Sequence, residues 1–306
     1  MAVSYGAEVE LSKKASFDPS KQKTLKKPIS ISGIGLFTAE SASLTIHPAD
    51  PDTGILFQRT DLPGNPKVIA DLDHVVSTPR CTILGNENCT IHTVEHVLAA
   101  LSAMGIDNAL LELSGPEVPI MDGSAEPFVD IILKGEIEEL DKERIVHKLD
   151  FPVSWSQGEV HIVAIPSEEL KISYTLQFPE SEILHSQYLC APITPEYFCK
   201  EIAPCRTFCL YEDIAPFIEN GLIKGGGLDN AVIIKNDVVI NPDGVRFSDE
   251  MVRHKILDLI GDLSLLAVSF CAHIIAIRSG HASNVAFAHG LLNQIKMEKA
   301  NNGERV

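Results

Sequence analysis

The order of strand-like and helix-like segments is the feature that most limits how this chain can fold. From about residue 24, short runs that alternate apolar and polar residues come first, followed by an apolar helix-like segment, one more strand and a second helix-like segment. After about residue 145 strand-like runs appear again, and the second half also ends in long helix-like segments. Runs of strands followed by helices favour two layered halves over alternating parallel β-α units. We therefore predict an α+β fold with two domains of similar topology, each a β-sheet layered against α-helices.

The individual elements follow from periodicity. In the first half the strand-like segments are KPISISGIGLF, ASLTIHP, GILFQR, KVIADL, CTIL and NALLELSG. The first half also has two predicted helices, at residues 91–104 and in SAEPFVDIILKG after the turn PIMDG. In the second half we expect strands at residues 160–165, 170–176 and 231–234 and in CAHIIAIRSG, with helices at residues 249–269 and in SNVAFAHGLLNQIKM.

The length of 306 residues suits two domains of roughly 150 residues each. The charged segment EIEELDKERIVHKLD has the composition of a linker, so we place the boundary near residue 145. This gives an N-terminal domain of residues 22–145 and a C-terminal domain of residues 146–306. Residues 1–21 are polar without a clear period, and we expect a flexible extension there.

Charge and cysteine content exclude several classes of function. The formal net charge of −17 disfavours nucleic-acid binding, which needs a basic face, and an anionic substrate would need a local cluster of Lys or Arg. The seven cysteines form no C-x-x-C pair and are expected to be reduced thiols. Neither a signal peptide nor a run of roughly 18 apolar residues is present. We expect a cytoplasmic protein with at most peripheral membrane contact.

The five residues HTVEH, 92–96, match the H-x-x-E-H pattern of the inverzincin zinc peptidases. If a helix covers residues 91–104, His92 and His96 share one face through the i, i+4 relation, and Glu95 lies beside both. Two histidine ligands here would indicate a protease, whereas a single ligand would allow different chemistry.

The second long helix, within RFSDEMVRHKILDLIGDLSLLAV, carries a more informative pattern. Ser248 is a plausible N-cap, and acidic residues occupy the first turn. His254, Asp258 and Asp262 follow at i, i+4 and i+8 on a helix that is otherwise apolar on most sides. Such a helix is too apolar for the surface, so we predict that this polar stripe lines a cavity.

Catalytic zinc requires three protein ligands and one open position. His254 and Asp258 supply two ligands from one helix face. The third must come from the other domain, and the residues alone leave His92 and His96 as alternatives.

Several motifs, taken together, resemble a known family. TVEHVLAAL, PIMDGSAEPFV, CRTF, GGGLDNAVI, RFSDEMVRHKILDLIGDL and SGHASN are similar, in order and spacing, to the UDP-3-O-acyl-N-acetylglucosamine deacetylases of lipid A biosynthesis in Gram-negative bacteria, over about residues 23–292. The resemblance implies a zinc-dependent amidohydrolase with its active site at the domain junction. Its substrate would be the small molecule UDP-3-O-acyl-GlcNAc, whose acetamide is hydrolysed to acetate and a free amine in the committed step of lipopolysaccharide lipid A synthesis. Oligomerisation is not required.

The resemblance also assigns ligands for one Zn²⁺ per chain. The family's metal ligands fall on His96, His254 and Asp258, and the family position of His92 is not a ligand. It therefore decides the question left open by the HTVEH motif, in favour of a single histidine from that motif.

Four further residues match the family's catalytic positions. Glu95 would take a proton from the attacking water, and His281 would act as the second acid-base group. Asp262 would orient His281, and Thr207 would stabilise the tetrahedral oxyanion.

Substrate contacts are implied for Lys255, Arg278 and Phe208. The two cations would contact phosphate or ribose, and the segment FIENGLIKGGGLDNAVII resembles the family's insert that forms the acyl-chain passage. The chain departs from the family at GIGLFTA, where Phe37 stands in place of the usual histidine. We expect this change to affect substrate fit and not the zinc site.

Two other functions compete with the deacetylase prediction. An inverzincin peptidase would need a downstream glutamate ligand, and the nearest candidates, Glu112 and Glu117, lie in strand and loop segments. A nucleotide-sugar or lipid-binding module without activity is the second, although every expected catalytic residue is present.

Overall fold

The computed structural model describes residues 20–301, so nearly all of the expected extension at residues 1–21 lies outside the described residues. Two five-stranded sheets dominate the fold. The first has the order β2 (Ile29–Ile34), β3 (Ser41–Pro48), β9 (Ala109–Leu113), β4 (Ile55–Arg59) and β5 (Lys67–Ile69). The second has the order β12 (Val153–Gln157), β13 (Val160–Ile165), β20 (His273–Ile277), β14 (Lys171–Gln177) and β15 (Ser186–Pro192).

The two sheets have the same topology. In each one, the third and fourth strands across the sheet pair in parallel, β9 with β4 and β20 with β14, and all other neighbours are antiparallel. Each half also has the same order along the chain, with four strands, a helix, the central strand and a second helix. The predicted α+β class with two related halves is therefore confirmed.

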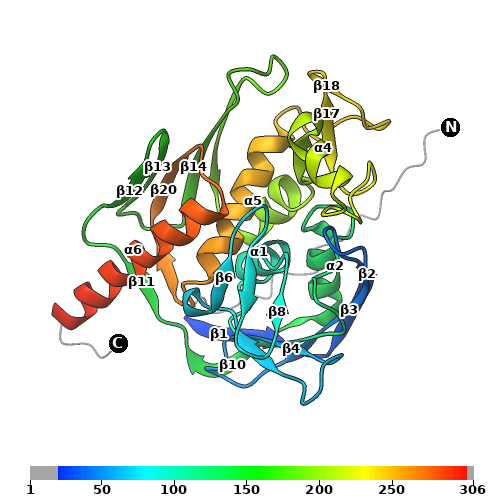
Figure 1. Ribbon diagram of the computed structural model, residues 1–306. Helices are drawn as coiled ribbons and strands as arrows, with labels where there is room; N and C mark the ends of the chain where they lie inside the picture. The colour runs from blue at the N-terminus through cyan, green and yellow to red at the C-terminus, as the bar shows by residue number, and fades with distance from the viewer. Residues whose placement is uncertain (1–19, 302–306) are drawn as a thin grey trace.

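Four helices lie between the sheets (Figure 1). These are α1 (Glu95–Ala103) and α2 (Glu126–Gly135) in the first half and α5 (Glu250–Ser264) and α6 (His281–Asn301) in the second. α2 packs on β2, whereas α5 and α6 pack on the second sheet, and the equivalent helices α1 and α5 contact each other extensively. The core follows the pleat of the strands, as in β3, where Ala42, Leu44 and Ile46 alternate inward.

The crossing of α1 and α5 is unusually close because α5 carries a glycine there. A Cβ atom at Gly261 would lie 2.2 Å from the backbone oxygen of Glu95, so no larger residue fits without a shift of the helices. This close approach brings the N-terminal end of α1 against the polar stripe of α5.

Shorter elements complete each half. The first half adds β1 (Lys21–Leu25) paired with β10 (Ile137–Glu143), η1 (Leu72–His74), and a small sheet of β6 (Val75–Ser77), β7 (Ile83–Gly85) and β8 (Thr90–Ile91). The second half adds β11 (Val146–Lys148) paired with β19 (Ser269–Cys271), α3 (Pro195–Tyr197), the π-helical turn η2 (Phe198–Ile202), α4 (Tyr211–Glu219), and a small sheet of β16 (Phe208–Leu210), β17 (Val232–Lys235) and β18 (Val238–Val239).

Several predicted boundaries were wrong. α1 begins at Glu95 and not at residue 91, because Thr93 adopts a left-handed conformation with φ +58°. α5 ends at Ser264 and not at residue 269, because Ala267 is also left-handed and the chain then enters β19. Its N-cap is Asp249, not Ser248.

The charged segment read as a linker contains β10 and β11. It has the composition of a linker because most residues of β10 are exposed. The domain boundary near residue 145 stays a prediction. Within residues 20–301, none of the helices combines the length and the apolar character needed to cross a bilayer.

Candidate metal centre and active site

Two imidazoles and a carboxylate meet where α1 crosses α5. His96 lies in the first turn of α1, whereas His254 and Asp258 lie one turn apart on α5. All three are buried, and one potential ligand atom of each lies within 4.8 Å of the other two. The Nε2 atom of His254 is 3.2 Å and that of His96 is 3.9 Å from Oδ1 of Asp258. Among the residues that the structure describes, only these three form a His/Cys/Asp/Glu group that could hold a metal ion.

The protonation states of these side chains suit a metal ligand set. The Nδ1 atom of His254 donates to the carbonyl oxygen of Cys205 at 3.0 Å, which leaves Nε2 as the nitrogen that faces Asp258. Burial, together with the neighbouring His254, lowers the pKa of His96 to about 3, so its imidazole is neutral. Burial opposes the charge of Asp258, but His254 and Lys255 hold its pKa well below the usual value.

The spacing of the three ligand atoms fits one small divalent ion. A tetrahedral zinc with ligands about 2.1 Å away keeps them roughly 3.4 Å apart. The separations of 3.2 Å and 3.9 Å to Asp258 are close to this value. Two imidazoles and one carboxylate are also a donor set typical of catalytic zinc.

A second polar group adjoins the three candidate ligands and combines a carboxyl with an imidazole. Oε1 of Glu95 lies 3.9 Å from Nε2 of His281, and Nδ1 of His281 donates to Oδ2 of Asp262 at 2.9 Å. Burial raises the pKa of Glu95 to about 7. Burial opposes the charge of His281, but Asp262 raises its pKa to about 9. Near neutral pH the pair thus offers a carboxyl close to its pKa beside an imidazolium, as general acid-base chemistry requires.

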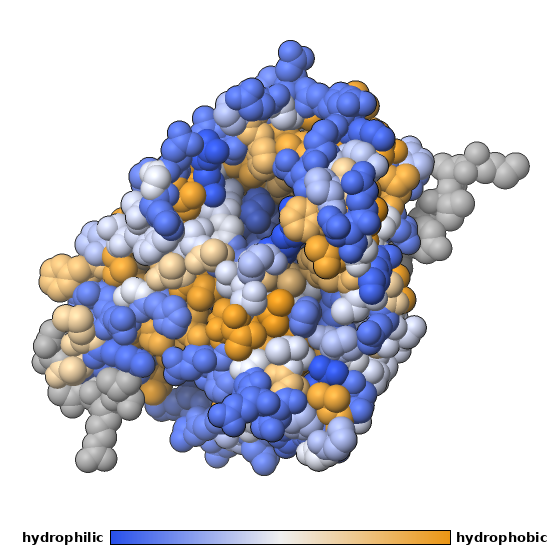
Figure 2. Space-filling view, viewed as in Figure 1, coloured by the Kyte–Doolittle hydropathy of each residue, from blue (hydrophilic) through white to orange (hydrophobic). Residues whose placement is uncertain are grey.

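A cavity of about 1080 Å³ extends from the candidate metal ligands between β14, α4 and α5. Figure 2 shows a hollow in this face with a hydrophilic floor and hydrophobic residues along the rim nearest α4. Thr207 and Phe208 line the cavity, and the Phe208 ring packs edge to face on Phe178 with ring centroids 6.2 Å apart. The backbone of Thr207 is fixed by a hydrogen bond from its N–H to the oxygen of Gly123 at 2.8 Å.

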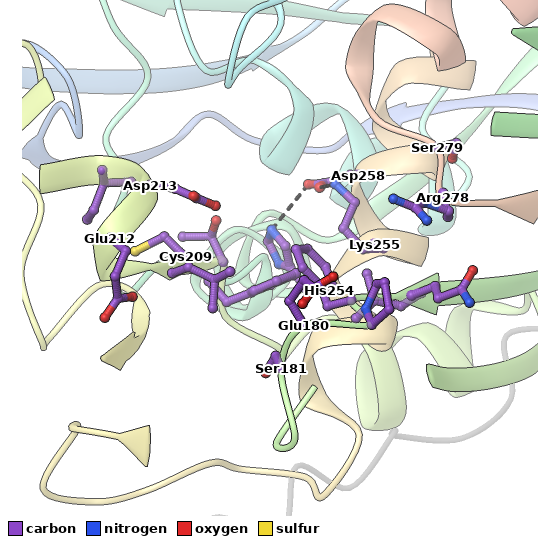
Figure 3. A pocket seen from close by; sticks show the side chains of 18 of the residues that line it. Glu180, Ser181, Cys209, Glu212, Asp213, His254, Lys255, Asp258, Arg278 and Ser279 are labelled. Atoms are coloured by element: carbon purple, nitrogen blue, oxygen red, sulfur yellow. Dashed lines mark hydrogen bonds and ion pairs between the residues drawn. The ribbon is translucent and has the colours of Figure 1, made fainter. Parts of the chain in front are cut away.

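Cations gather at this cavity although the whole chain is acidic. Nζ of Lys255 lies 2.6 Å from Oδ2 of Asp258, and Arg278 pairs with the exposed Glu159 at 2.9 Å. Asp258 raises the pKa of Lys255 although burial opposes its charge. Arg80 also lines the cavity. Figure 3 shows Lys255 and Arg278 on the side of the pocket opposite Glu212 and Asp213. Three cations therefore line the cavity, alongside acidic residues that include Glu212 and Asp213.

His92 does not share a helix face with His96, and that prediction was wrong. Because Thr93 is left-handed, His92 precedes the helix and forms an isolated bridge with residue 117. Its backbone N–H donates to Pro116 and its oxygen accepts from Val118. His92 lies outside the group of candidate ligands.

The glutamates required by the peptidase hypothesis are also engaged elsewhere. Glu112 pairs with His47 at 2.9 Å on the first sheet. Glu117 is buried and accepts hydrogen bonds from the backbone of Phe37, from the backbone and hydroxyl of Thr38, and from the hydroxyl of Thr93. Neither belongs to the candidate metal group in the described part of the chain.

Two residues of the site were missed from the sequence. Oδ1 of Asp262 accepts from the Thr82 hydroxyl at 2.6 Å, and Oδ2 accepts from Nδ2 of Asn284 at 2.8 Å. The backbone N–H of Thr82 also donates to Oε2 of Glu95 at 3.1 Å. Asn284 lies in the SGHASN motif, which could have drawn attention to it. Thr82 carries no sequence signal, since it lies in the strand-like segment CTIL.

Comparison with known proteins agrees with this geometry. A family model described as "UDP-3-O-acyl N-acetylglycosamine deacetylase" matches residues 22–293. A protein named UDP-3-O-acyl-N-acetylglucosamine deacetylase from Chlamydia pneumoniae is 46% identical over 277 residues, which cover 90% of this chain and 98% of that protein.

Proteins of the same name in two further species are similar to the chain. The one from Chlamydia felis is 45% identical over 275 residues, with 90% of this chain and 98% of that protein covered. The one from Chlamydia muridarum is 44% identical over 278 residues, with 91% and 97% covered. The chain belongs to the UDP-3-O-acyl N-acetylglycosamine deacetylase family.

Proposed function

We propose that this protein hydrolyses the acetamide of UDP-3-O-acyl-N-acetylglucosamine, releasing acetate and a free amine, in a cytoplasmic step of lipid A biosynthesis. Family membership and the names of the similar proteins support the reaction. The observation that carries the proposal is that the group of His96, His254 and Asp258 adjoins the Glu95 and His281 pair beside a large cavity. His254, Asp258 and His281 line that cavity. All seven cysteines lie in the described residues, and none of them forms a disulfide there.

His96, His254 and Asp258 would hold one Zn²⁺ per chain, one ligand from the first half and two from the second. When bound, zinc lowers the pKa of a coordinated water and polarises the amide carbonyl. We also propose that the boundary between the two domains that contribute these ligands lies near residue 145.

Glu95 is the residue we assign to remove the proton from the attacking water. Its Oε2 is occupied by the Thr82 N–H, so Oε1 is the oxygen free to accept a proton. Because burial brings the pKa of Glu95 to about 7, the carboxylate can accept that proton and release it again near neutral pH.

His281 is assigned to protonate the leaving amine. Its Nδ1 proton is held by Asp262, so Nε2 is the nitrogen that turns toward Glu95 and the reacting group. With a pKa of about 9, the imidazole carries a proton at neutral pH and can also stabilise the oxyanion of the substrate. The Thr207 hydroxyl would donate a second hydrogen bond to that oxyanion.

The cavity walls suit the two ends of the substrate. Lys255 and Arg278 would contact phosphate or ribose. Phe208 and the insert at residues 217–234 would contact the acyl chain. Phe37, from the motif that departs from the family, accepts a backbone hydrogen bond from Lys224 of this insert at 3.3 Å, so its effect would fall on substrate fit.

Acetate release from UDP-linked 3-O-acyl-GlcNAc, followed by mass spectrometry, tests the proposal. We expect one zinc per chain, loss of activity with a chelator and recovery when zinc is added back. A protein that releases no acetate in its zinc-loaded form would disprove the proposal. Chelator-sensitive cleavage of denatured proteins would instead establish a peptidase.

A further inference from the structure

Among the described residues, Thr82 alone forms hydrogen bonds to both Glu95 and Asp262. It lies between β6 and β7 of the first half and is fully buried. Its backbone N–H donates to Oε2 of Glu95 at 3.1 Å, and its hydroxyl donates to Oδ1 of Asp262 at 2.6 Å. Two carboxylates from opposite halves of the molecule are therefore bridged by a single threonine.

The bond to Asp262 completes the hydrogen bonding of a carboxylate that has no solvent exposure. Its Oδ2 accepts from His281 Nδ1 and Asn284 Nδ2, and its Oδ1 accepts from Thr82 alone among the hydrogen bonds of the described residues. Two of the three donors lie on α6 and the third lies in the segment between β6 and β7, so the plane of the carboxylate is fixed on both sides. Without the Thr82 hydroxyl the carboxylate could rotate about its bond to Cβ and carry the His281 ring with it.

The segment that carries Thr82 is itself held in place. Arg80 is left-handed, with φ +68°, and its guanidinium lies 3.8 Å from the centroid of the Phe217 ring on α4. Cys81 is buried. The short segment that carries Thr82 is thus held to the second half by two contacts, that of Arg80 with Phe217 and that of the Thr82 hydroxyl with Asp262.

We propose that Thr82 is a positioning residue that fixes the proton-accepting Glu95 and the proton-donating His281 relative to each other, through its N–H and through its hydroxyl on Asp262. This inference rests on the proposed function, since it assigns those two roles to Glu95 and His281. Thr82 does not belong to the candidate metal group and does not line the cavity, so its effect should appear in the rate of the chemical step and not in binding.

Thr82→Val tests the inference, because valine has the shape of threonine without the hydroxyl, and the backbone N–H remains. A hydrogen bond to a charged group contributes an amount that corresponds to about a ten- to a hundredfold change in rate. We expect kcat for acetate release to fall by this factor while KM and zinc content stay at the wild-type values. Thr82→Ser, which keeps the hydroxyl, should restore most of the rate.

Thr24→Val is the matched control. Thr24 is also a buried threonine, and its hydroxyl bonds only to the backbone of Asn108 and Ala49, away from the site. It should lose stability comparably to Thr82→Val while its kcat stays unchanged. If Thr82→Val does not fold, Thr82→Ala, which also lacks the hydroxyl but adds no bulk, replaces it.

Three results would overturn the inference, namely an unchanged kcat in Thr82→Val, an equal loss of kcat in Thr24→Val, or a rise in KM as the main effect. These results are distinguishable from a failure of the proposed function, because in that case the wild-type protein itself releases no acetate.

Discussion

The helices α1 and α5 hold equivalent places in the two halves, yet the chain starts them in different ways. α5 begins regularly after Asp249, whereas α1 begins after the left-handed Thr93, and neither has a side-chain cap. Each start is instead tied to one fully buried glutamate, Glu117 in the first half and Glu250 in the second. The starts of the two equivalent helices are therefore both anchored by a buried glutamate, but through different interactions.

The two glutamates differ in their partners. Glu250 belongs to α5 itself and forms an ion pair with Arg206 at 2.9 Å, and it also accepts from the backbone of Arg206 and Arg246. Burial alone would raise the pKa of Glu250, but the Arg206 hydrogen bonds bring it below the usual value. Glu117 lies outside α1, and within the described residues its side chain accepts hydrogen bonds only from neutral backbone and hydroxyl groups. The start of α5 is thus anchored through a glutamate of the helix itself, whereas the start of α1 is anchored through a glutamate outside the helix.

This difference matches what each helix supplies to the site. α5 supplies a regular stripe of His254, Asp258 and Asp262, which depends only on helical periodicity. α1 supplies Glu95 and His96 from its first turn, where a small change in the start of the helix would move both side chains.

The largest expected effect follows from removal of one ligand from either half. In His254→Ala and in His96→Ala only two of the proposed protein ligands remain, so we expect zinc content to fall from the proposed one per chain to nearly none and acetate release to fall to background. Metal analysis after dialysis measures the first quantity. A variant of either half that keeps a full equivalent of zinc would show that the two halves do not share one ion.

The next effect separates metal binding from proton transfer within α1. Glu95→Gln removes the proton acceptor but none of the three candidate ligands, so kcat should fall by about 10²- to 10⁴-fold while zinc content stays at one per chain. The comparison with His96→Ala is informative because the two residues are adjacent. Wild-type kcat in Glu95→Gln would rule out its role as the base.

A smaller effect, on stability, tests the two buried glutamates directly. Glu250→Gln leaves the Arg206 guanidinium buried without its carboxylate, which should lower the free energy of unfolding by about 3–5 kcal/mol. Glu117→Gln leaves only neutral donors unpaired, at a cost of about 1–3 kcal/mol. Urea denaturation of both variants gives the comparison. A larger loss in Glu117→Gln would mean that the loop contacts, and not the ion pair, dominate.

The metal-free protein should also lose stability with rising pH because of His281 in the second half. The folded-state pKa of His281 is raised from 6.5 to about 9 by Asp262, so folding favours the protonated form. This contribution, about 3 kcal/mol, is fully present below pH 6.5 and is lost as pH rises through 9. Unfolding free energies of the chelated wild type and of His281→Gln between pH 6 and pH 10 measure it. Parallel curves for the two proteins would contradict the assignment.

The sequence predicted the second half better than the first, for a physical reason. The stripe on α5 is a property of one segment, and the structure buries all three of its residues. The start of α1 depends on Thr93, whose left-handed conformation is held by Glu117, a residue 24 positions away. The role of Thr82 depends on a contact with Asp262, 180 positions away. Periodicity within a segment carries no information about either contact.

The smallest expected effect concerns His92, the residue of the HTVEH segment that could be mistaken for a metal ligand. If the H-x-x-E-H pattern formed one helix turn, His92 would be a ligand equivalent to His254. Instead the left-handed Thr93 separates it from α1, and its ring has only a 3.5 Å contact with the Thr90 hydroxyl. His92→Ala should therefore keep one zinc per chain and wild-type kcat, with at most about 1 kcal/mol of lost stability. Loss of zinc in this variant would show that His92 is a metal ligand and would favour the peptidase hypothesis. In that case α1 would have to extend toward its N-terminus through the HTVEH segment.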